Sequence, residues 1–332
     1  MRRIILVCPG RGSYGRDTLR SIPRGPVVEA ADAFRAALAR PTPTEMDATD
    51  TFSSRLHVAG ENASILTMTA ALADLEQLRE VEVVGVVGNS MGWYTALAAA
   101  GALSLQDALR LVETMGQYQA NNVIGAQLLY PLVDDEWQRL PSPELELILD
   151  DTAEMYHSIH LGGQAVLGGS TEAINGAMKR LPPRKIGDRD APMILPLHSA
   201  FHTPLMAPTA ARAQHDLADL GWQSPAVPLV DGHGTVHWPR HGSPAALRAY
   251  TLGAQVTEPY DFGLGLVTAL RELAPEAIVL LGPGGNLGGA AGQVLAREGW
   301  RGVHDKASFL ALQAREPFVL AMSRPEQRAL VT

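Results

Sequence analysis

A serine flanked by two glycines is the residue of this chain best placed to act as a nucleophile. The segment Gly88–Gly92 has the pattern Gly-x-Ser-x-Gly and lies between an apolar run at 81–87 and an alanine-rich run at 94–100, which predicts a strand, a sharp turn and a helix. Glycines on both sides let the backbone pass closely while the hydroxyl of Ser90 stays exposed. The new helix directs its free N–H groups and the positive end of its dipole at the same point. We therefore expect Ser90 to attack an acyl group, whose oxyanion those N–H groups would bind.

A serine nucleophile needs a general base, and His202 has the most suitable local chemistry among the ten histidines. Phe201 would shield the imidazole, and Thr203-Pro204 would begin a helix that fixes it in place. Taken alone, a histidine in this setting is more often a helix cap or a core residue, so its role depends on the rest of the chain.

Two other clusters are weaker candidates. The glycines of the loop at 9–15 match a dinucleotide-binding spacing, but no apolar helix follows them and the loop lacks the lysine of a phosphate loop. The spacing of His233, His237 and His241 would suit zinc on one helix. Neighbouring glycines and a proline predict a loop there instead, so we expect neither nucleotide binding by those motifs nor a metal.

Composition narrows the class of protein. The chain has 332 residues, 46% of them hydrophobic, and a formal net charge of -8 without a block of basic residues, which disfavours nucleic acid as a partner. The apolar run at the start ends at Pro9 after five residues, too short for the core of a signal peptide, and no apolar stretch is long enough to span a bilayer. The single cysteine, Cys8, excludes an intrachain disulfide framework. We expect a cytoplasmic monomer that binds neither nucleic acid nor membrane.

Hydrophobic periodicity predicts helices at 27–40, 62–80 and 105–118, and apolar runs at 193–197, 227–230 and 277–281 lead into glycine-bearing turns or polar loops. Strands that end in such turns and alternate with helices are typical of an α/β sheet with its site beyond the strand ends. We therefore expect a large α/β subdomain, hydrolase-like, with a central and mostly parallel sheet.

From residue 125 the pattern changes to shorter elements. We expect strands at 126–132 and 158–167, a short helix at 134–139, an apolar stretch at 145–149, a helix at 171–181 and a linker at 181–185. This alternation predicts a small ferredoxin-like α+β subdomain at 125–196, inserted between the two parts of the large subdomain, 1–124 and 197–332. It leaves and re-enters the large part between Ser90 and His202, so we expect it to pack over the turn and form the far wall of an acyl cleft.

Five motifs in this order resemble those of the malonyl-CoA:acyl carrier protein transacylase family, which includes the acyltransferase domains of polyketide and fatty acid synthases. The resemblance covers most of the chain. Its carriers are Pro9–Ser13, Gly88–Gly92, Ala200–Met206, Gln255 and Gly282–Gly284.

The resemblance implies ping-pong acyl transfer. Ser90 would attack a thioester, His202 would take its proton, and the phosphopantetheine thiol of an acyl carrier protein would then cleave the acyl-enzyme. The resemblance also implies that the backbone carbonyl of Gln255 orients the histidine and that the backbone N–H groups of Arg11 and Met91 form the oxyanion hole. No permanent cofactor is implied, because a coenzyme A or phosphopantetheine thioester is the substrate.

Four positions of the substrate site depart from the family pattern. Asn89 replaces the usual histidine, Trp93 a frequent glutamate, Arg11 a glutamine, and Met115 the arginine that forks onto the malonyl carboxylate. An unpaired carboxylate in a desolvated pocket is costly, whereas an apolar chain packs well against methionine. We therefore expect an uncharged acyl group, bound by Met115, Trp93, Asn89 and Phe201. The alternative is that Arg11 has taken over the carboxylate.

Two other function classes stay open at this level. A pocket that admits water would make the same two residues an acyl-carrier-protein hydrolase with a proofreading role, because transfer and hydrolysis share the acyl-enzyme. A non-catalytic docking module is opposed by the presence of both Ser90 and His202. The acyl chain and the pathway are not specified by the sequence.

Overall fold

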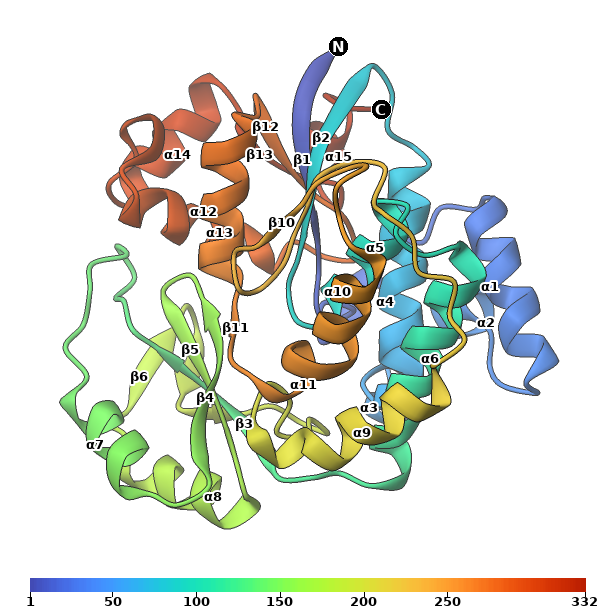
Figure 1. Ribbon diagram of the computed structural model, residues 1–332. Coiled ribbons are helices and arrows are strands. Elements are labelled where there is room, and N and C mark those ends of the chain that lie inside the picture. The colour runs from blue at the N-terminus through green and yellow to red at the C-terminus, as the bar shows by residue number, and fades with distance from the viewer.

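A six-stranded sheet forms the centre of the larger part of the protein (Figure 1). The computed structural model describes residues 1–332 apart from the side chain of residue 121. Neighbouring strands within this sheet are parallel, except for the outermost pair, β10 and β9, which is antiparallel. The expected central and mostly parallel sheet is confirmed. In spatial order the strands are β10 (Val236–His237), β9 (Leu229–Val230), β2 (Val81–Gly88), β1 (Arg2–Cys8), β12 (Ala277–Leu280) and β13 (Val319–Ala321).

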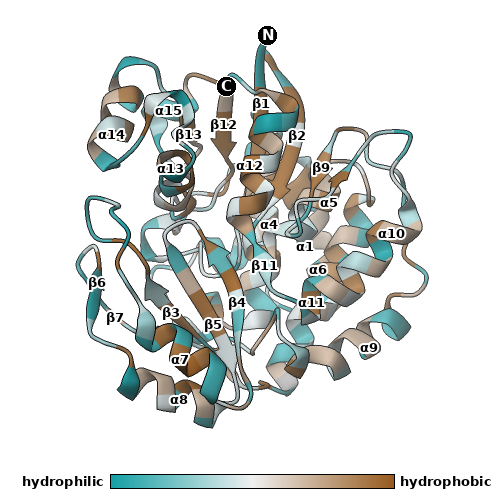
Figure 2. Ribbon diagram, turned by 60° about the vertical axis from the view of Figure 1, so that its left-hand side comes forward, coloured by the Kyte–Doolittle hydropathy of each residue, from teal (hydrophilic) through white to brown (hydrophobic). Residues whose placement is uncertain are grey.

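Helices cover both faces of this sheet, which explains why its central strands read as continuous apolar runs. Residues 4–8 of β1 are fully buried, and the strands are brown in the hydropathy colouring of Figure 2. On one side lie α1 (Pro26–Ala37), α4 (Gly60–Leu75), α5 (Gly92–Ala99) and α6 (Leu105–Asn121), and on the other α12 (Phe262–Leu273), α13 (Leu287–Arg297) and α14 (Lys306–Arg315) (Figure 1).

Shorter helical segments connect these elements. None of the helices in the described part of the chain is long and apolar enough to cross a bilayer. The short segments are η1 (Arg16–Thr18), α2 (Pro43–Asp47), α3 (Ser54–His57), η2 (Pro204–Met206), α9 (Ala207–Asp216), α10 (Pro244–Ala249), the π-helical η3 (Tyr250–Ala254), α11 (Gln255–Thr257), η4 (Trp300–Gly302) and α15 (Pro325–Arg328).

A second, five-stranded sheet carries the expected ferredoxin-like order. Along the chain, β3 (Ala126–Pro131), α7 (Pro143–Asp151), β4 (Met155–Leu161), β5 (Gln164–Gly169), α8 (Thr171–Arg180) and β8 (Met193–Ile194) follow one another. In space the strands lie in the order β4-β5-β3-β8 with antiparallel neighbours. Both helices pack on one face of this sheet (Figure 2), over a separate apolar cluster that includes Leu128, Tyr130 and Ile174.

The fifth strand of this sheet comes from the large part of the chain. β11 (Tyr260–Asp261) pairs in parallel with β4, where Tyr260 lies opposite Ile159. The two sheets are therefore connected at a point outside 125–196. A two-residue strand has no periodicity, which is why the sequence did not predict it.

Three predictions within 125–196 are wrong in detail. Residues 134–139 form a turn rather than a helix, because the Asp134 carboxylate accepts hydrogen bonds from the backbone N–H groups of Glu136 and Gln138. The single strand expected at 158–167 is a hairpin of β4 and β5 that turns at Gly162, whose φ is 61°. The expected linker at 181–185 leads into a ribbon of β6 (Arg184–Ile186) and β7 (Arg189–Ala191).

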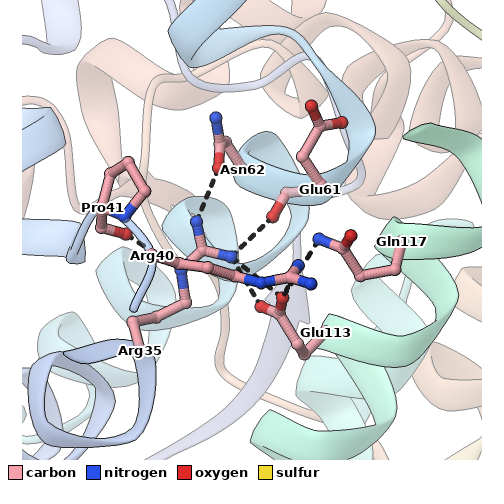
Figure 3. A network of polar contacts seen from close by, with 7 residues as sticks. All are labelled: Arg35, Arg40, Pro41, Glu61, Asn62, Glu113 and Gln117. Carbon is pink, nitrogen blue, oxygen red and sulfur yellow. Dashed lines mark hydrogen bonds and ion pairs between the residues drawn. The ribbon is translucent and has the colours of Figure 1, made fainter. Parts of the chain in front are cut away.

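A buried polar cluster joins α1, α4 and α6 (Figure 3). Glu113 of α6 accepts hydrogen bonds from Arg35 at 2.7 Å and from Arg40 at 2.5 Å. Arg35 also donates to the side chain of Asn62 at 2.6 Å and to the Glu61 carbonyl at 3.0 Å. The Arg35 side chain is only 1% exposed and that of Glu113 6%. Because its partners come from α1, α4, α6 and the chain just after α1, the cluster fixes α6 against its neighbours.

Candidate active site

Ser90 occupies a tight turn between β2 and α5. Its φ of 54° lies in the left-handed region, which is strained for a side chain of this kind. Close packing around the turn needs two glycines, Gly92 in the turn itself and Gly10 in the loop after β1. A Cβ at Gly10 would lie 2.7 Å from the Asn89 carbonyl oxygen, and one at Gly92 would lie 2.8 Å from the carbonyl carbon of Cys8. These close approaches bring the loop after β1 against the turn that carries Ser90.

His202 lies next to Ser90. Its Nε2 is 2.8 Å from the Ser90 Oγ, and its Nδ1 is 2.6 Å from the backbone carbonyl oxygen of Gln255. A carbonyl only accepts, so Nδ1 carries the hydrogen and Nε2 presents its lone pair to the hydroxyl. Burial lowers the pKa of His202 to about 4, although the hydrogen bond to Gln255 opposes this shift. Near neutral pH the imidazole is therefore uncharged and able to accept a proton.

Gln255 contacts both members of this pair. While its backbone carbonyl accepts from His202, its side-chain Nε2 donates to the backbone carbonyl of Ser90 at 3.1 Å. The orientation of this amide is fixed by Tyr94, whose hydroxyl donates to Oε1 at 3.0 Å. Tyr94 is one helical turn beyond Ser90, and no sequence motif singles it out.

Ser90 and His202 open into a cavity of about 730 Å³ that both sheets help to line. Arg11 and Met91 also line it. The small sheet contributes an apolar wall that faces the large part. Its members are Leu129, Ile159, Leu161, Val166, Met193 and Leu195.

Comparison with known proteins shows which proteins this chain resembles. No protein-family model matches the chain. The malonyl CoA-acyl carrier protein transacylase of Mycobacterium tuberculosis H37Rv is 29% identical over 306 residues, which covers 87% of this chain and 92% of that protein. The non-reducing polyketide synthase nscA of Arthroderma gypseum is 26% identical over 68% of this chain, and the chain spans only 13% of that synthase's length. The Bacillus subtilis transacylase is matched over about half its length, 53%.

Its relatives in sequence and its neighbours in structure are malonyl-CoA:acyl carrier protein transacylases and polyketide synthase acyltransferases.

Solved structures of the family have the same fold. The malonyl-CoA:ACP transacylase of Synechocystis sp. PCC 6803 superposes with a TM-score of 0.75 over all of both chains at 17% identity. The structure of a type II polyketide synthase acyl carrier protein in complex with its malonyl-transacylase contains a chain that superposes with a TM-score of 0.74. The match covers 99% of this chain and 98% of the matched chain, at 18% identity. The expected fold class is confirmed.

Two of the four departures from the pattern, Met115 and Arg11, line the cavity, and Arg11 contacts the helix that carries Met115. Met115 is buried in the cavity wall. The guanidinium of Arg11 donates to the side-chain carbonyl of Gln119, one turn after Met115 on α6, and to the backbone carbonyl of Leu197. Burial lowers the pKa of Arg11 to about 10, while the nearby Glu61 opposes this shift. The cation is therefore held by neutral carbonyl groups of the chain itself.

The other two departures differ in their positions. Asn89 lines the cavity beside Ser90, and so does Phe201 beside His202. Trp93 does not, and its expected role in substrate binding is wrong. The Trp93 ring is fully buried behind the site, where Nε1 donates to the Thr251 hydroxyl at 2.8 Å. It packs edge-on against Tyr250, with ring centroids 5.1 Å apart.

Four further histidines make contacts away from Ser90 and His202. His237 contacts Asp231 at 2.8 Å and His233 lies 3.6 Å from Glu258, and the described residues contain no cluster of three ligands for a metal ion. The rings of His157 and His160 lie against each other at a tilt of 33°, with centroids 4.8 Å apart, outside the cavity.

His198 is the cavity residue that the sequence reasoning missed. Its ring lines the cavity, and its Nδ1 lies 3.0 Å from the Oε1 of Gln127 on β3. It stands four residues before His202 in the same motif, so a search of that motif for a second polar side chain would have found it.

Proposed function

We propose that this chain transfers acyl groups between thioesters through an ester on Ser90. In this mechanism His202 Nε2 takes the hydroxyl proton as Oγ attacks the thioester carbonyl carbon, and the imidazolium returns the proton to the sulfur when the C–S bond breaks. An acceptor thiol then attacks the ester, and the same two residues act in reverse. The chain of contacts from Gln255 through His202 to Ser90 is the observation that supports this proposal.

The oxyanion is proposed to accept hydrogen bonds from the backbone N–H groups of Met91 and Arg11. Met91 is the first residue after the nucleophile and stands at the N-terminal end of α5, where N–H groups are free and the dipole is positive. Arg11 reaches the cavity on the loop that packs against the turn. A backbone donor does not depend on the side chain, so arginine in place of glutamine preserves it. Loss of one donor would raise the barrier by about 3 kcal/mol.

The donor and acceptor are proposed to be coenzyme A and phosphopantetheine thioesters, the latter on an acyl carrier protein of polyketide or fatty acid synthesis. The similarity to a malonyl-CoA transacylase and to a polyketide synthase supports this assignment, as does the solved complex of a transacylase with its carrier protein. The natural docking place is the seam where the two sheets meet over the cavity, because a pantetheine arm has to reach Ser90 from there.

The test is mass spectrometry of the protein after brief exposure to butyryl-pantetheine, with and without a holo carrier protein. Formation of a butyryl adduct on Ser90 and its loss to the carrier thiol would support transfer. Release of free butyrate at the same rate without the carrier would instead show the hydrolase that uses the same acyl-enzyme.

We further propose that the transferred acyl group carries no charge. Met115 offers the acyl chain a polarizable apolar surface in place of a guanidinium. The guanidinium that is present, on Arg11, already donates to two carbonyl groups of the chain. A malonyl carboxylate would have to share that guanidinium with them, using only the N–H groups that they leave over.

Replacing Met115 by arginine is expected to shift selectivity toward malonyl. A bidentate contact with the carboxylate would favour malonyl over butyryl by about 1–3 kcal/mol, less the cost of desolvating the new guanidinium. The measurement is the second-order rate constant of acyl-enzyme formation for both pantetheine thioesters. The companion variant is Arg11→Gln. If the wild type already prefers malonyl and Arg11→Gln removes that preference, Arg11 binds the carboxylate and the uncharged-acyl proposal is wrong.

The pH dependence of acylation should report the buried His202. Because only the neutral imidazole accepts a proton and burial holds its pKa at about 4, the rate should be constant from neutral pH down to about pH 5. Below pH 4 it should fall roughly tenfold for each unit. Circular dichroism at each pH distinguishes this decline from acid unfolding. A midpoint near pH 6.5 with the fold intact would contradict the effect of burial.

A further inference from the structure

Two polar groups stand together in the otherwise apolar part of the cavity wall. Arg11 donates through one terminal nitrogen to the carbonyl of Leu197, which places the guanidinium beside His198. Burial, and after it the positive charge of Arg11, lowers the pKa of His198 well below its usual value. His198 and Arg11 both line the cavity, and we call them the His198–Arg11 pair.

The hydrogen-bond network behind His198 fixes which ring nitrogen carries the hydrogen. Ser158 Oγ donates to the Phe201 carbonyl at 2.9 Å and therefore accepts from Gln127 Nε2, 2.7 Å away. This orients the Gln127 amide with Oε1 toward His198 Nδ1, 3.0 Å away. Nδ1 is consequently the donor, and Nε2 carries a lone pair. Within the described residues, no donor of the protein contacts Nε2.

The pair thus presents an acceptor and donors side by side. Each terminal nitrogen of Arg11 has one N–H in a hydrogen bond with the chain and one left over. A hydroxyl group matches this arrangement, because it can donate to His198 Nε2 and accept from the guanidinium at once. A carboxylate could satisfy only the guanidinium and would face the lone pair of Nε2. A plain alkyl chain would leave His198 Nε2 and the remaining N–H groups of Arg11 without a partner.

We propose that the His198–Arg11 pair recognises a hydroxyl group on the acyl chain, so that hydroxyacyl thioesters are preferred over their deoxy counterparts. This inference rests on the proposed function and narrows its substrate class to uncharged chains with a hydroxyl near the thioester. His198 is then a specificity-determining residue supplied by the segment that leads to His202, and Gln127 is the positioning residue behind it.

The test compares 2-hydroxybutyryl-, 3-hydroxybutyryl- and butyryl-pantetheine as acyl donors to Ser90. The quantity is the ratio of the rate constants of acyl-enzyme formation, hydroxybutyryl to butyryl, because a general loss of activity cancels in it. Wild type should prefer one of the two hydroxyacyl groups by on the order of tenfold, as is typical of a site whose polar groups would otherwise stay unpaired. His198→Leu should bring the ratio to about one.

His198→Asn is the conservative variant, because its amide can donate to Gln127 and still offer an oxygen to the hydroxyl. It should retain most of the preference. An equal rate for all three donors in the wild type, or the same ratio in His198→Leu as in the wild type, would overturn the inference. The absence of an acyl adduct on Ser90 with all three donors would overturn the proposed function, and this inference with it.

Discussion

Replacement of Ser90 by alanine is expected to abolish the acyl-enzyme. Without Oγ no ester can form, and His202 has no proton to take from the position 2.8 Å away. The rate of acyl transfer to a carrier thiol should fall by a factor on the order of 10⁴–10⁶, because a nucleophile and its base act as a unit. His202→Ala should cause a loss of similar size for the same reason. Intact-protein mass spectrometry after exposure to butyryl-pantetheine measures the effect directly.

The matched control is Ser104→Ala, which removes a serine hydroxyl from the N-cap of α6, outside the cavity. That variant should acquire the same adduct as the wild type, although loss of a cap costs about 1 kcal/mol of stability. An acyl adduct that persists on Ser90→Ala at the wild-type rate would show that another residue is the nucleophile.

Glu113→Ala should produce the largest loss of stability among single replacements in the polar cluster of α1, α4 and α6. The change leaves the fully buried Arg35 and the partly buried Arg40 without their common anion, at contacts of 2.7 and 2.5 Å in the native protein. Stranding a buried charge in this way costs about 3–5 kcal/mol. For a chain of this length, this corresponds to a melting temperature lower by roughly 4–7 °C. Thermal unfolding followed by circular dichroism is the measurement.

Asp219→Ala is the control. Asp219 forms an ion pair of 2.7 Å with Arg110, which lies on α6 like Glu113, but this pair is at the surface. Its melting temperature should stay close to that of the wild type, because exposed pairs contribute little. The double replacement Arg35→Met with Glu113→Leu should recover much of the lost stability, since neither charge is then left unpaired. A melting temperature of Glu113→Ala equal to that of the wild type would show that the cluster is not held by charge.

The amino-acid sequence predicts the local elements near the site well. The apolar strand, the glycine-flanked serine and the alanine-rich helix each carry a local signal, because a strained turn needs glycine wherever backbone passes closely. The ferredoxin-like order of the small sheet follows from alternating short elements. The position of Gln255 was inferred from the family resemblance alone, because a backbone carbonyl has no residue preference.

What the sequence did not predict depends on contacts between distant segments. Trp93 follows the nucleophile closely in sequence, but a helix turns each successive side chain by about 100°, and this one points away from the cavity into the core. Arg11 and His198 come together only because the loop after β1 meets the segment that returns from the small sheet. Asp134 replaced a helix by a turn through its own side chain.

The parallel pairing of β11 with β4 bears on how acyl specificity can be exchanged between relatives. The small sheet carries much of the cavity wall, so it is the natural unit to graft when a new acyl group is wanted. One of its strands, Tyr260–Asp261, lies some seventy residues downstream of the others and directly after the segment that holds Gln255. In a chimera cut at 125 and 196, the native β11 would pair with a β4 from another protein. Any misfit between these two strands would shift the neighbouring Gln255 carbonyl, which orients His202. The transplantable module is therefore discontinuous, and its second piece is two residues long.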